Sequence, residues 1–395
     1  MKIAMIGAKG LPAKFGGIET HVAEISTRLI KAGYEVVVYA RNWYTEKEIF
    51  AYNGIQIIRV PSFVSPVKAT DGVTNVLLAT LHAVFFLKPD IYHFHGVGPA
   101  LFAWLPRIFA SRAKVIVTVH ALDKDQAKWP EWSRKWLELG ERATTVFAHE
   151  VIVVSRYLQR YFKDRFGVIA NYLPNGVNPV RVVTDYTVLT PFSLQPHDYI
   201  LMVSRLVRHK SAQTMISAWQ EARKSRPNLF TGLKLAIVGG SAATDDYVAE
   251  LKEQIADDDS IVMTGFQSGS VLSGLFAGAR FVVHPSTMEG LPIAVLEGMS
   301  YGKAVIAADI PANREAVGEQ GLTFAPGDIA QLAKAIVYFL ETPKEVISRG
   351  HMSRVFVEDA YNWEEITAGL KVVYKGAVKS WYSPALLDKA KQLRI

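Results

Sequence analysis

The sequence alternates short apolar runs rich in Val and Ile with longer segments of helical periodicity, beginning at its second residue. This alternation is typical of parallel strands joined by crossover helices, because strands buried on both faces read as continuous apolar runs. The strands expected in the first half span residues 2–6, 34–40, 55–60, 90–94, 114–120 and 151–155. The rhythm restarts at residue 199, and further strands are expected at residues 234–239, 261–265, 280–284 and 304–308. Both halves are therefore predicted to be doubly wound, Rossmann-like α/β sheets.

The length of the chain also favours two domains. Its 395 residues exceed the size at which a single core usually keeps growing. A stretch rich in Pro, Thr and Asn at residues 177–196 interrupts the rhythm, so we predict an N-terminal domain over residues 1–187 and a C-terminal domain over 188–377. Ligands of doubly wound sheets bind beyond the carboxyl ends of the strands. The loops to search are therefore those that follow Ile6, His120, Ser204, Val238, Gly265 and His284.

Composition narrows the class of protein. The chain has no cysteine, which removes disulfides, thiolate metal sites and cysteine nucleophiles and favours a reducing cytoplasm. The N-terminus enters a strand and a glycine loop at once, so no signal peptide is expected. The apolar stretch at residues 76–87 is shorter than the roughly 20 residues that cross a bilayer. We therefore expect a cytoplasmic protein without a membrane-spanning segment.

The formal charge of +7 is unevenly distributed. Residues 1–187 contain 23 Lys and Arg against 15 Asp and Glu, whereas residues 188–395 contain 21 against 22. This asymmetry indicates an anionic partner for the N-terminal half, either a membrane surface or a phosphorylated acceptor. Nucleic acid is disfavoured, because the sequence has neither a recognition motif nor a dense basic helix.

The glycine loop after the first strand is a candidate anion site. Gly16 and Gly17 stand directly before a helix, where backbone N–H groups and the positive helix end can approach an anion without side-chain obstruction. An ordinary flexible turn is the alternative. The spacing is not the GxGxxG of dinucleotide-binding enzymes, although Arg41 leaves an NADP enzyme open. Gly239, after the strand at 234–239, is expected to contact the same ligand.

Two glutamates around a helix start are the strongest signal. Glu289 precedes a helix with Pro292 in its first turn, and Glu297 lies eight residues further on. Both carboxylates can face a crevice toward which the amides of Gly290, Leu291 and Ile293 also point. Carboxylates accept hydrogen bonds from sugar hydroxyls and helix-end amides hold phosphate, which suits a sugar nucleotide. The alternative is a pair of solvated acids that merely favour the helix dipole.

This segment resembles the E-x7-E signature of the retaining glycosyltransferases of family 4, which have the GT-B fold. The resemblance implies that Glu289 lies at the transferred sugar and that Glu297 binds the ribose. By the same resemblance, Arg205 and Lys210 in VSRLVRHKS bind the pyrophosphate, and His120 contacts the transferred sugar. A helix at about residues 378–395 is expected to cross back to the N-terminal domain, as the final helices of the family usually do.

The resemblance implies transfer of a hexose or deoxyhexose from a UDP-, dTDP- or GDP-linked donor. No metal or other cofactor is expected, because the acidic run at residues 257–259 lies at the amino end of a strand, away from the crevice. The acceptor is expected to be a glycan or a lipid-linked sugar of surface polysaccharide synthesis. GLPAKFGGIETHV resembles a subgroup that includes rhamnosyltransferases, from which Ala121, Lys124 and Asp125 depart. A sugar-nucleotide epimerase and a non-catalytic sugar-nucleotide-binding protein remain alternatives. A glycoside hydrolase is disfavoured, because Glu289 and Glu297 lie on one side of the expected ligand.

The segment from residue 102 to residue 142 mixes tryptophans with basic residues. These residue types favour membrane interfaces. We therefore expect the N-terminal domain to contact the inner face of the plasma membrane, with Lys128, Arg134 and Lys135 among the contacts. The alternative is that Trp132 and Trp136, four residues apart on a helix, belong to the core.

Overall fold

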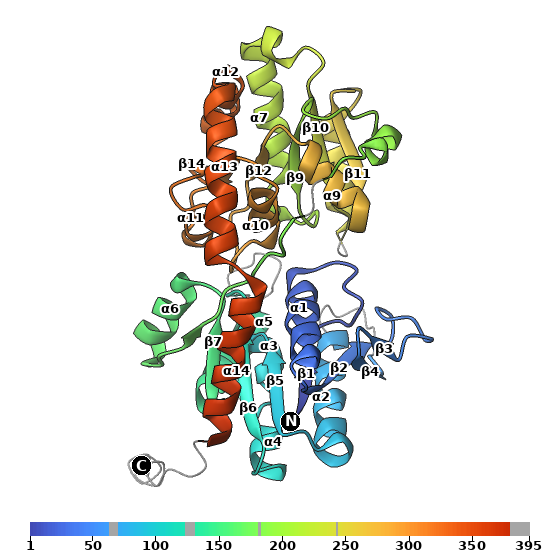
Figure 1. Cartoon of the computed structure of the whole chain (residues 1–395), viewed down its shortest axis with the longest axis vertical. Coiled ribbons are helices and arrows are strands. Elements are labelled where there is room, and N and C mark those ends of the chain that lie inside the picture. The colour runs from blue at the N-terminus through green and yellow to red at the C-terminus, as the bar shows by residue number, and fades with distance from the viewer. Residues whose placement is uncertain (63–69, 123–130, 181–182, 242–243, 380–395) are drawn as a thin grey trace.

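A computed structural model describes residues 1–62, 70–122, 131–180, 183–241 and 244–379, with side chains from residue 135 onward in the segment that begins at 131. The chain forms two α/β domains stacked end to end, each built around its own sheet (Figure 1). The first domain contains the N-terminal half of the chain and the second domain contains the C-terminal half. This arrangement agrees with the predicted pair of doubly wound sheets.

The first sheet has eight strands in the order β3-β4-β2-β1-β5-β6-β7-β8. They are β1 (Lys2–Ile6), β2 (Glu35–Arg41), β3 (Ala51–Tyr52), β4 (Ile55–Val60), β5 (Ile91–His95), β6 (Lys114–Val119), β7 (Glu150–Val153) and β8 (Asn171–Tyr172). Pairing is parallel except between β3 and β4. The strand order reverses beside β1, which places a ligand crevice at the carboxyl ends of β1 and β5.

Helices cover both faces of this sheet. They are α1 (Gly17–Lys31), α2 (Thr70–His82), its π-helical continuation η1 (Ala83–Leu87), α3 (Val97–Ala100), α4 (Trp104–Phe109), α5 (Glu131–Phe147) and α6 (Arg156–Phe166). Helix α1 forms because apolar residues recur at helical spacing, and it buries Val22, Ile25 and Leu29 against the sheet. Ser155 caps the N-terminus of helix α6, because its hydroxyl accepts from the backbone N–H of Leu158.

The second sheet has six parallel strands in the order β11-β10-β9-β12-β13-β14. They are β9 (Tyr199–Val203), β10 (Lys234–Val238), β11 (Ile261–Gly265), β12 (Val282–His284), β13 (Val305–Ala308) and β14 (Leu322–Phe324). The order reverses beside β9, so the second crevice opens at the carboxyl ends of β9 and β12. The loops at the carboxyl ends of strands from both sheets line one cavity.

The second domain contains seven α-helices and three 3-10 turns among the described residues. The helices are α7 (Ala212–Ser225), α8 (Asp245–Ile255), α9 (Gly269–Gly278), α10 (Ile293–Ser300), α11 (Pro311–Val317), α12 (Ile329–Glu341) and the long α13 (Pro343–Ala360), of which α11 is the shortest. The 3-10 turns are η3 (Thr187–Phe192), η4 (Arg208–Lys210) and η5 (Pro227–Phe230). Helix α9 packs on η3, so the segment just after the predicted domain boundary contacts the second domain.

The final described helix, α14 (Trp363–Lys379), returns to the first domain (Figure 1). Its apolar stripe of Trp363, Ile366, Leu370 and Tyr374 packs with the core residues of α1 and β1. The sequence had assigned residues 363–377 to the C-terminal domain, but this stripe is buried against the first sheet. Most of the helix expected at 378–395 lies outside the described residues. The domain limits of the full chain therefore stay a prediction.

One helical segment could cross a membrane by length and composition. Residues Thr70–Leu87 form a continuous helical run of 18 residues with a mean hydropathy of 1.4, of which 33% is buried in the protein. This run is longer than the apolar stretch at residues 76–87 that the sequence shows, because the helix starts at Thr70 and continues through η1. Core helices of water-soluble proteins meet the same criterion, so the finding alone does not place this helix in a bilayer.

Candidate functional site

A cavity of about 410 Å³ lies between the two domains. Its walls are the loops that follow β1, β6, β9, β10, β11 and β12, which are the strand ends that the sequence singled out. All eleven predicted site residues line it. They are Gly16, Gly17, His120, Arg205, Lys210, Gly239, Glu289, Gly290, Leu291, Ile293 and Glu297. The volume falls in the range of small-molecule sites.

Glu289 is held between two basic side chains. His284 at the end of β12 lies 2.7 Å from its Oε1, and the Lys210 ammonium donates to the same oxygen. Burial alone would raise the pKa of Glu289, but the Lys210 charge and the hydrogen bonds from His284 and Lys210 hold it well below its usual range. Glu289 is therefore an anion at neutral pH. Lys210, expected at a diphosphate, is engaged with this carboxylate.

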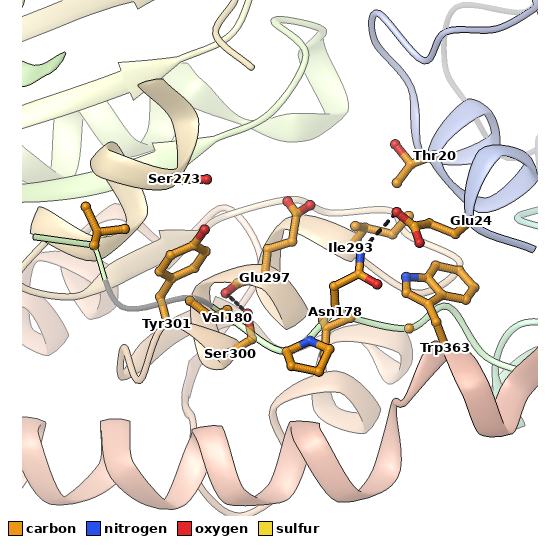
Figure 2. Close-up of a pocket in the computed structure, with 14 residues that line it drawn as sticks. Thr20, Glu24, Asn178, Val180, Ser273, Ile293, Glu297, Ser300, Tyr301 and Trp363 are labelled. Atoms are coloured by element: carbon orange, nitrogen blue, oxygen red, sulfur yellow. Dashed lines mark hydrogen bonds between the residues drawn. The ribbon is translucent and has the colours of Figure 1, made fainter. Parts of the chain in front are cut away.

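Glu297 lies on α10 and lines the cavity, and no residue in the described part of the chain forms an ion pair with it. Burial raises its pKa to about 7, and the nearby charge of Glu24 on α1 adds to the shift. A second cavity of about 390 Å³ adjoins the first and shares Thr20, Ile293 and Glu297 with it. Figure 2 shows that Glu24 and Glu297 enter this second cavity from different domains. Glu297 thus stands at the junction of the two cavities.

Arg205 follows β9 and supplies an uncommitted positive charge. Among the residues that the structure describes, none accepts a hydrogen bond from its guanidinium or forms an ion pair with it. Gly239, after β10, lies beside this loop so closely that a Cβ there would come within 1.7 Å of the Ser204 carbonyl oxygen. The absence of a side chain at Gly239 therefore lets the two loops meet along one wall of the cavity.

The glycine loop brings the N-terminus of α1 to the opposite wall. Gly16 has a φ of 110°, and a Cβ there would collide with Glu19, whose carboxylate accepts from the Lys9 backbone N–H over 2.9 Å. Gly17 opens α1 and lies beside Ile293, the first residue of α10. The N-termini of α1 and α10 therefore reach the same cavity from the two domains.

His120 follows β6 and belongs to a group of buried histidines that the sequence reading missed. His21 on α1 and His95 at the end of β5 lie beside it, and one ring nitrogen of each falls within 4.8 Å of the others. These three could hold a metal ion by ligand type. A tetrahedral ion with bonds of about 2.0–2.1 Å needs nitrogens roughly 3.3 Å apart, so the rings would have to move inward.

Asn175 and Gly290 join the two domains beneath the cavity. Asn175, from the first half, accepts from the ring of His21 over 3.0 Å and donates to the Leu291 carbonyl over 2.9 Å. Gly290 packs so tightly that a Cβ would lie 1.5 Å from the His120 carbonyl oxygen. From the sequence, Gly290 is expected only as an amide donor, and Asn175 is not among the expected site residues. The alternating HFH of β5 and the PNG turn were the available signals.

Models of known families match both halves of the chain. Residues 15–181 match Glycosyltransferase Family 4, and residues 197–342 match Glycosyl transferases group 1. Together these matches span most of the chain, and the two-domain architecture is that of the GT-B fold. The chain therefore carries glycosyltransferase domains of family 4 and group 1 in the GT-B fold.

Relatives of full length support this assignment. An uncharacterized glycosyltransferase of Methanocaldococcus jannaschii is 23% identical over 96% of this chain and 99% of its own. A glycogen synthase of Mycobacterium tuberculosis is 23% identical over 97% of each chain. Sucrose-phosphate synthase of Thermosynechococcus elongatus shares the fold, with a TM-score of 0.81, 22% identity and coverage of 96% and 99%. Anabaena HepE with UDP-glucose bound has a TM-score of 0.77, 19% identity and coverage of 95% and 100%.

Proposed function

We propose that the chain transfers a hexose or deoxyhexose from a nucleotide diphosphate sugar to a glycan or lipid-linked acceptor, with retention of configuration and without a metal ion. The observation that carries this proposal is the convergence of two helix N-termini and Arg205 on one cavity between the domains. Helix N-termini and guanidinium groups both favour phosphate oxygens. A diphosphate held there would link the walls of the two domains.

The proposed chemistry depends on positive charge at the leaving group. No side chain is assigned as a nucleophile, because the departing phosphate oxygen takes the acceptor proton in a same-face transfer. Arg205 and the amides of α1 and α10 stabilise the charge that grows on the diphosphate as the bond to the sugar breaks. Lys210 contributes through Glu289, which it binds, and Glu289 remains an anion beside the transferred sugar. Its charge favours the cationic character that the sugar develops.

The donor is proposed to be a UDP-, dTDP- or GDP-linked sugar, with Glu297 at the ribose. The Anabaena neighbour, solved with UDP-glucose, supports this substrate class by fold. A thermal-shift screen of UDP-glucose, dTDP-rhamnose and GDP-mannose, with Glu297→Ala as the control variant, tests the proposal. Stabilisation by one of these sugars that Glu297→Ala loses supports the cavity as the donor site. Equal stabilisation of both proteins places the donor elsewhere.

We also propose peripheral attachment of the first domain to the cytoplasmic face of an anionic membrane. An apolar patch of Phe85, Phe86, Trp104, Ile108 and Phe109 is exposed on η1 and α4, and the rings of Phe85 and Phe109 lie 5.8 Å apart. Exposed apolar groups of this kind mark interaction sites. The sequence predicts a membrane contact within residues 102–142, and the exposed patch shares Trp104, Ile108 and Phe109 with that segment and adds Phe85 and Phe86. The placements of Lys128 and Trp129 and the side chains of Trp132 and Arg134 lie outside the described residues.

Positive charge beside the patch favours lipid over a neutral protein partner. Lys88, Arg107 and Arg112 are exposed on the same elements or next to them. Each basic residue near an anionic surface contributes about 1 kcal/mol, which salt screens. Sedimentation with anionic and neutral vesicles at low salt tests this. Phe86→Ser with Phe109→Ser should abolish binding to anionic vesicles, whereas Ile169→Ser, at an exposed residue outside the patch, should not. Equal, weak sedimentation with both vesicle types would remove the membrane from the proposal.

A further inference from the structure

The three histidines under the cavity are uncharged at neutral pH. His21 and His95 are almost completely buried, and His120 lines the cavity beside them. Burial lowers the pKa of His21 to about 4. Burial, together with the neighbouring imidazoles, lowers the pKa of His95 and His120 well below the usual value. A neutral imidazole has one protonated and one bare ring nitrogen, so the hydrogen-bond partners decide which is which.

Met5 on β1 decides the tautomer of His95. The Nε2 of His95 lies 3.4 Å from the Met5 sulfur, in a contact buried from solvent. A thioether sulfur has no hydrogen to donate and acts only as a weak acceptor. The tautomer in which this contact is a hydrogen bond has the proton of His95 on Nε2, which then donates to the sulfur. In that tautomer the other nitrogen of His95, Nδ1, is bare.

The bare nitrogen of His95 in turn decides the tautomer of His120. The two atoms in contact are His95 Nδ1 and His120 Nε2, 3.2 Å apart. Because Nδ1 of His95 has a lone pair and no hydrogen, Nε2 of His120 must supply the proton. His120 is neutral, so its remaining nitrogen, Nδ1, is bare.

The third histidine, His21, cannot donate a hydrogen bond to the bare Nδ1 of His120. The Leu291 carbonyl only accepts, so the amide nitrogen of Asn175 points at Leu291 and its oxygen points at His21. His21 therefore donates from Nδ1 to Asn175 and has no second hydrogen to give. Its ring stands edge-on to His120 with centroids 4.8 Å apart.

We infer that His95 is a positioning residue for sugar recognition: through the Met5–His95–His120 chain it fixes His120 with a bare Nδ1, which accepts a hydrogen bond from a hydroxyl of the transferred sugar. The inference rests on the proposed function for its last step only. It predicts that a donor lacking this hydroxyl is a poorer substrate, because a site built to pair with a hydroxyl discriminates against its absence.

The tautomer of His120 can be measured without turnover. In protein labelled with ¹⁵N at histidine, ring-nitrogen chemical shifts separate bare from protonated nitrogens, and the His120→Asn variant identifies the His120 signals. The expected wild-type pattern is a protonated Nε2 and a bare Nδ1. In His95→Leu, which keeps bulk without an acceptor, the His120 signals should move toward a mixture of tautomers. In His95→Asn, whose amide oxygen can replace Nδ1, they should stay close to wild type.

Kinetics then test the consequence for transfer. His95→Leu should lower kcat by about 10-fold or more, and His95→Asn should remain within about 3-fold of wild type, since a tenfold change corresponds to one modest hydrogen bond. A protonated Nδ1 on His120 in the wild type overturns the inference. So does a His120 tautomer that is unchanged in a folded His95→Leu protein. If no nucleotide sugar binds the wild type, the proposed function fails, while the tautomer result still decides the positioning role.

Discussion

The side-chain amide of Asn175 donates to the backbone carbonyl of Leu291 across 2.9 Å, and this bond joins the end of the first domain to the loop that begins α10. The same side chain accepts from His21 with its oxygen. Both ends of a buried amide are therefore used, one in each domain. The loop of Glu289 and the histidines are thereby held in one arrangement.

Asn175→Asp should loosen this link. A carboxylate would keep the bond to His21 but would face the Leu291 carbonyl without a hydrogen to donate. Leaving a buried polar group unsatisfied costs about 1–3 kcal/mol, so the unfolding free energy should fall by that amount. Denaturant unfolding measures it. Asn171→Asp is the matched control, because it removes bonds to Glu150 and to the Val151 carbonyl that lie within the first domain. Only Asn175→Asp should weaken donor binding, and an equal loss of donor affinity in both variants would contradict the role of Asn175.

Glu297 should make donor binding depend on pH. Its pKa of about 7 means that it gains negative charge as the pH rises through neutrality. A carboxylate accepts hydrogen bonds from ribose hydroxyls more strongly than a carboxylic acid. The affinity for a nucleotide sugar should therefore increase between about pH 6 and pH 8, one unit on either side of that pKa. Calorimetry at three pH values measures this trend.

Three variants separate the causes of this trend. Glu297→Ala should weaken donor binding by about 1.5–3 kcal/mol, and Glu297→Gln should remove the pH dependence. Glu24→Gln removes the neighbouring negative charge, so the midpoint should move to lower pH. A midpoint that stays in place in Glu24→Gln would show that Glu24 does not raise the pKa of Glu297, and an unchanged affinity in Glu297→Ala would show that Glu297 does not contact the donor.

Arg205→Ala should lower kcat more than it raises KM, because charge builds on the diphosphate mainly in the transition state. Removing one such donor typically costs about 10²–10³ in rate. Lys210→Ala should act in the same direction by leaving Glu289 without its ion-pair partner. Arg208, in the same loop, is exposed and pairs with Glu250, so Arg208→Ala is the control. An effect confined to KM in both Arg205→Ala and Lys210→Ala would contradict the assigned roles.

Gly290→Ala should separate the donor loop from the first domain. The added Cβ would overlap the His120 carbonyl oxygen, a backbone atom that cannot turn aside. Overpacking of this kind costs about 1–3 kcal/mol, which thermal unfolding should detect together with loss of activity. Gly376→Ala on α14 meets nothing within 4 Å and should be neutral or slightly stabilising. A fully active Gly290→Ala enzyme would mean that this contact is not needed for transfer.

Much of the fold could be predicted from the sequence, because buried parallel strands produce apolar runs that are visible without tertiary information. Strands β3, β8 and β14 were missed, since two or three residues at a sheet edge give no periodic signal. The place of α14 was also missed. Its apolar stripe predicts a buried helix, but the identity of the sheet that buries it depends on the path of the whole chain.

The candidate site was predictable to a similar extent. Strand-end loops and helix starts have local signatures, and all eleven residues chosen from them line the cavity. The His21, His95 and Asn175 contacts join segments up to 154 residues apart, so no local pattern reveals them. The pairing of Lys210 with Glu289, 79 residues away, has the same origin.

The release of nucleoside diphosphate tests the proposed transfer most directly. The protein is incubated with each nucleotide sugar, with and without glycan and membrane-lipid acceptors, and free nucleoside diphosphate is measured alongside the fate of the sugar. The account predicts release from one donor only when an acceptor is present, with a large loss in Arg205→Ala. Release without acceptor would indicate a hydrolase. Conversion of the sugar without release would indicate an epimerase, and binding with neither would leave a binding protein; each of these results would contradict the assignment as a transferase.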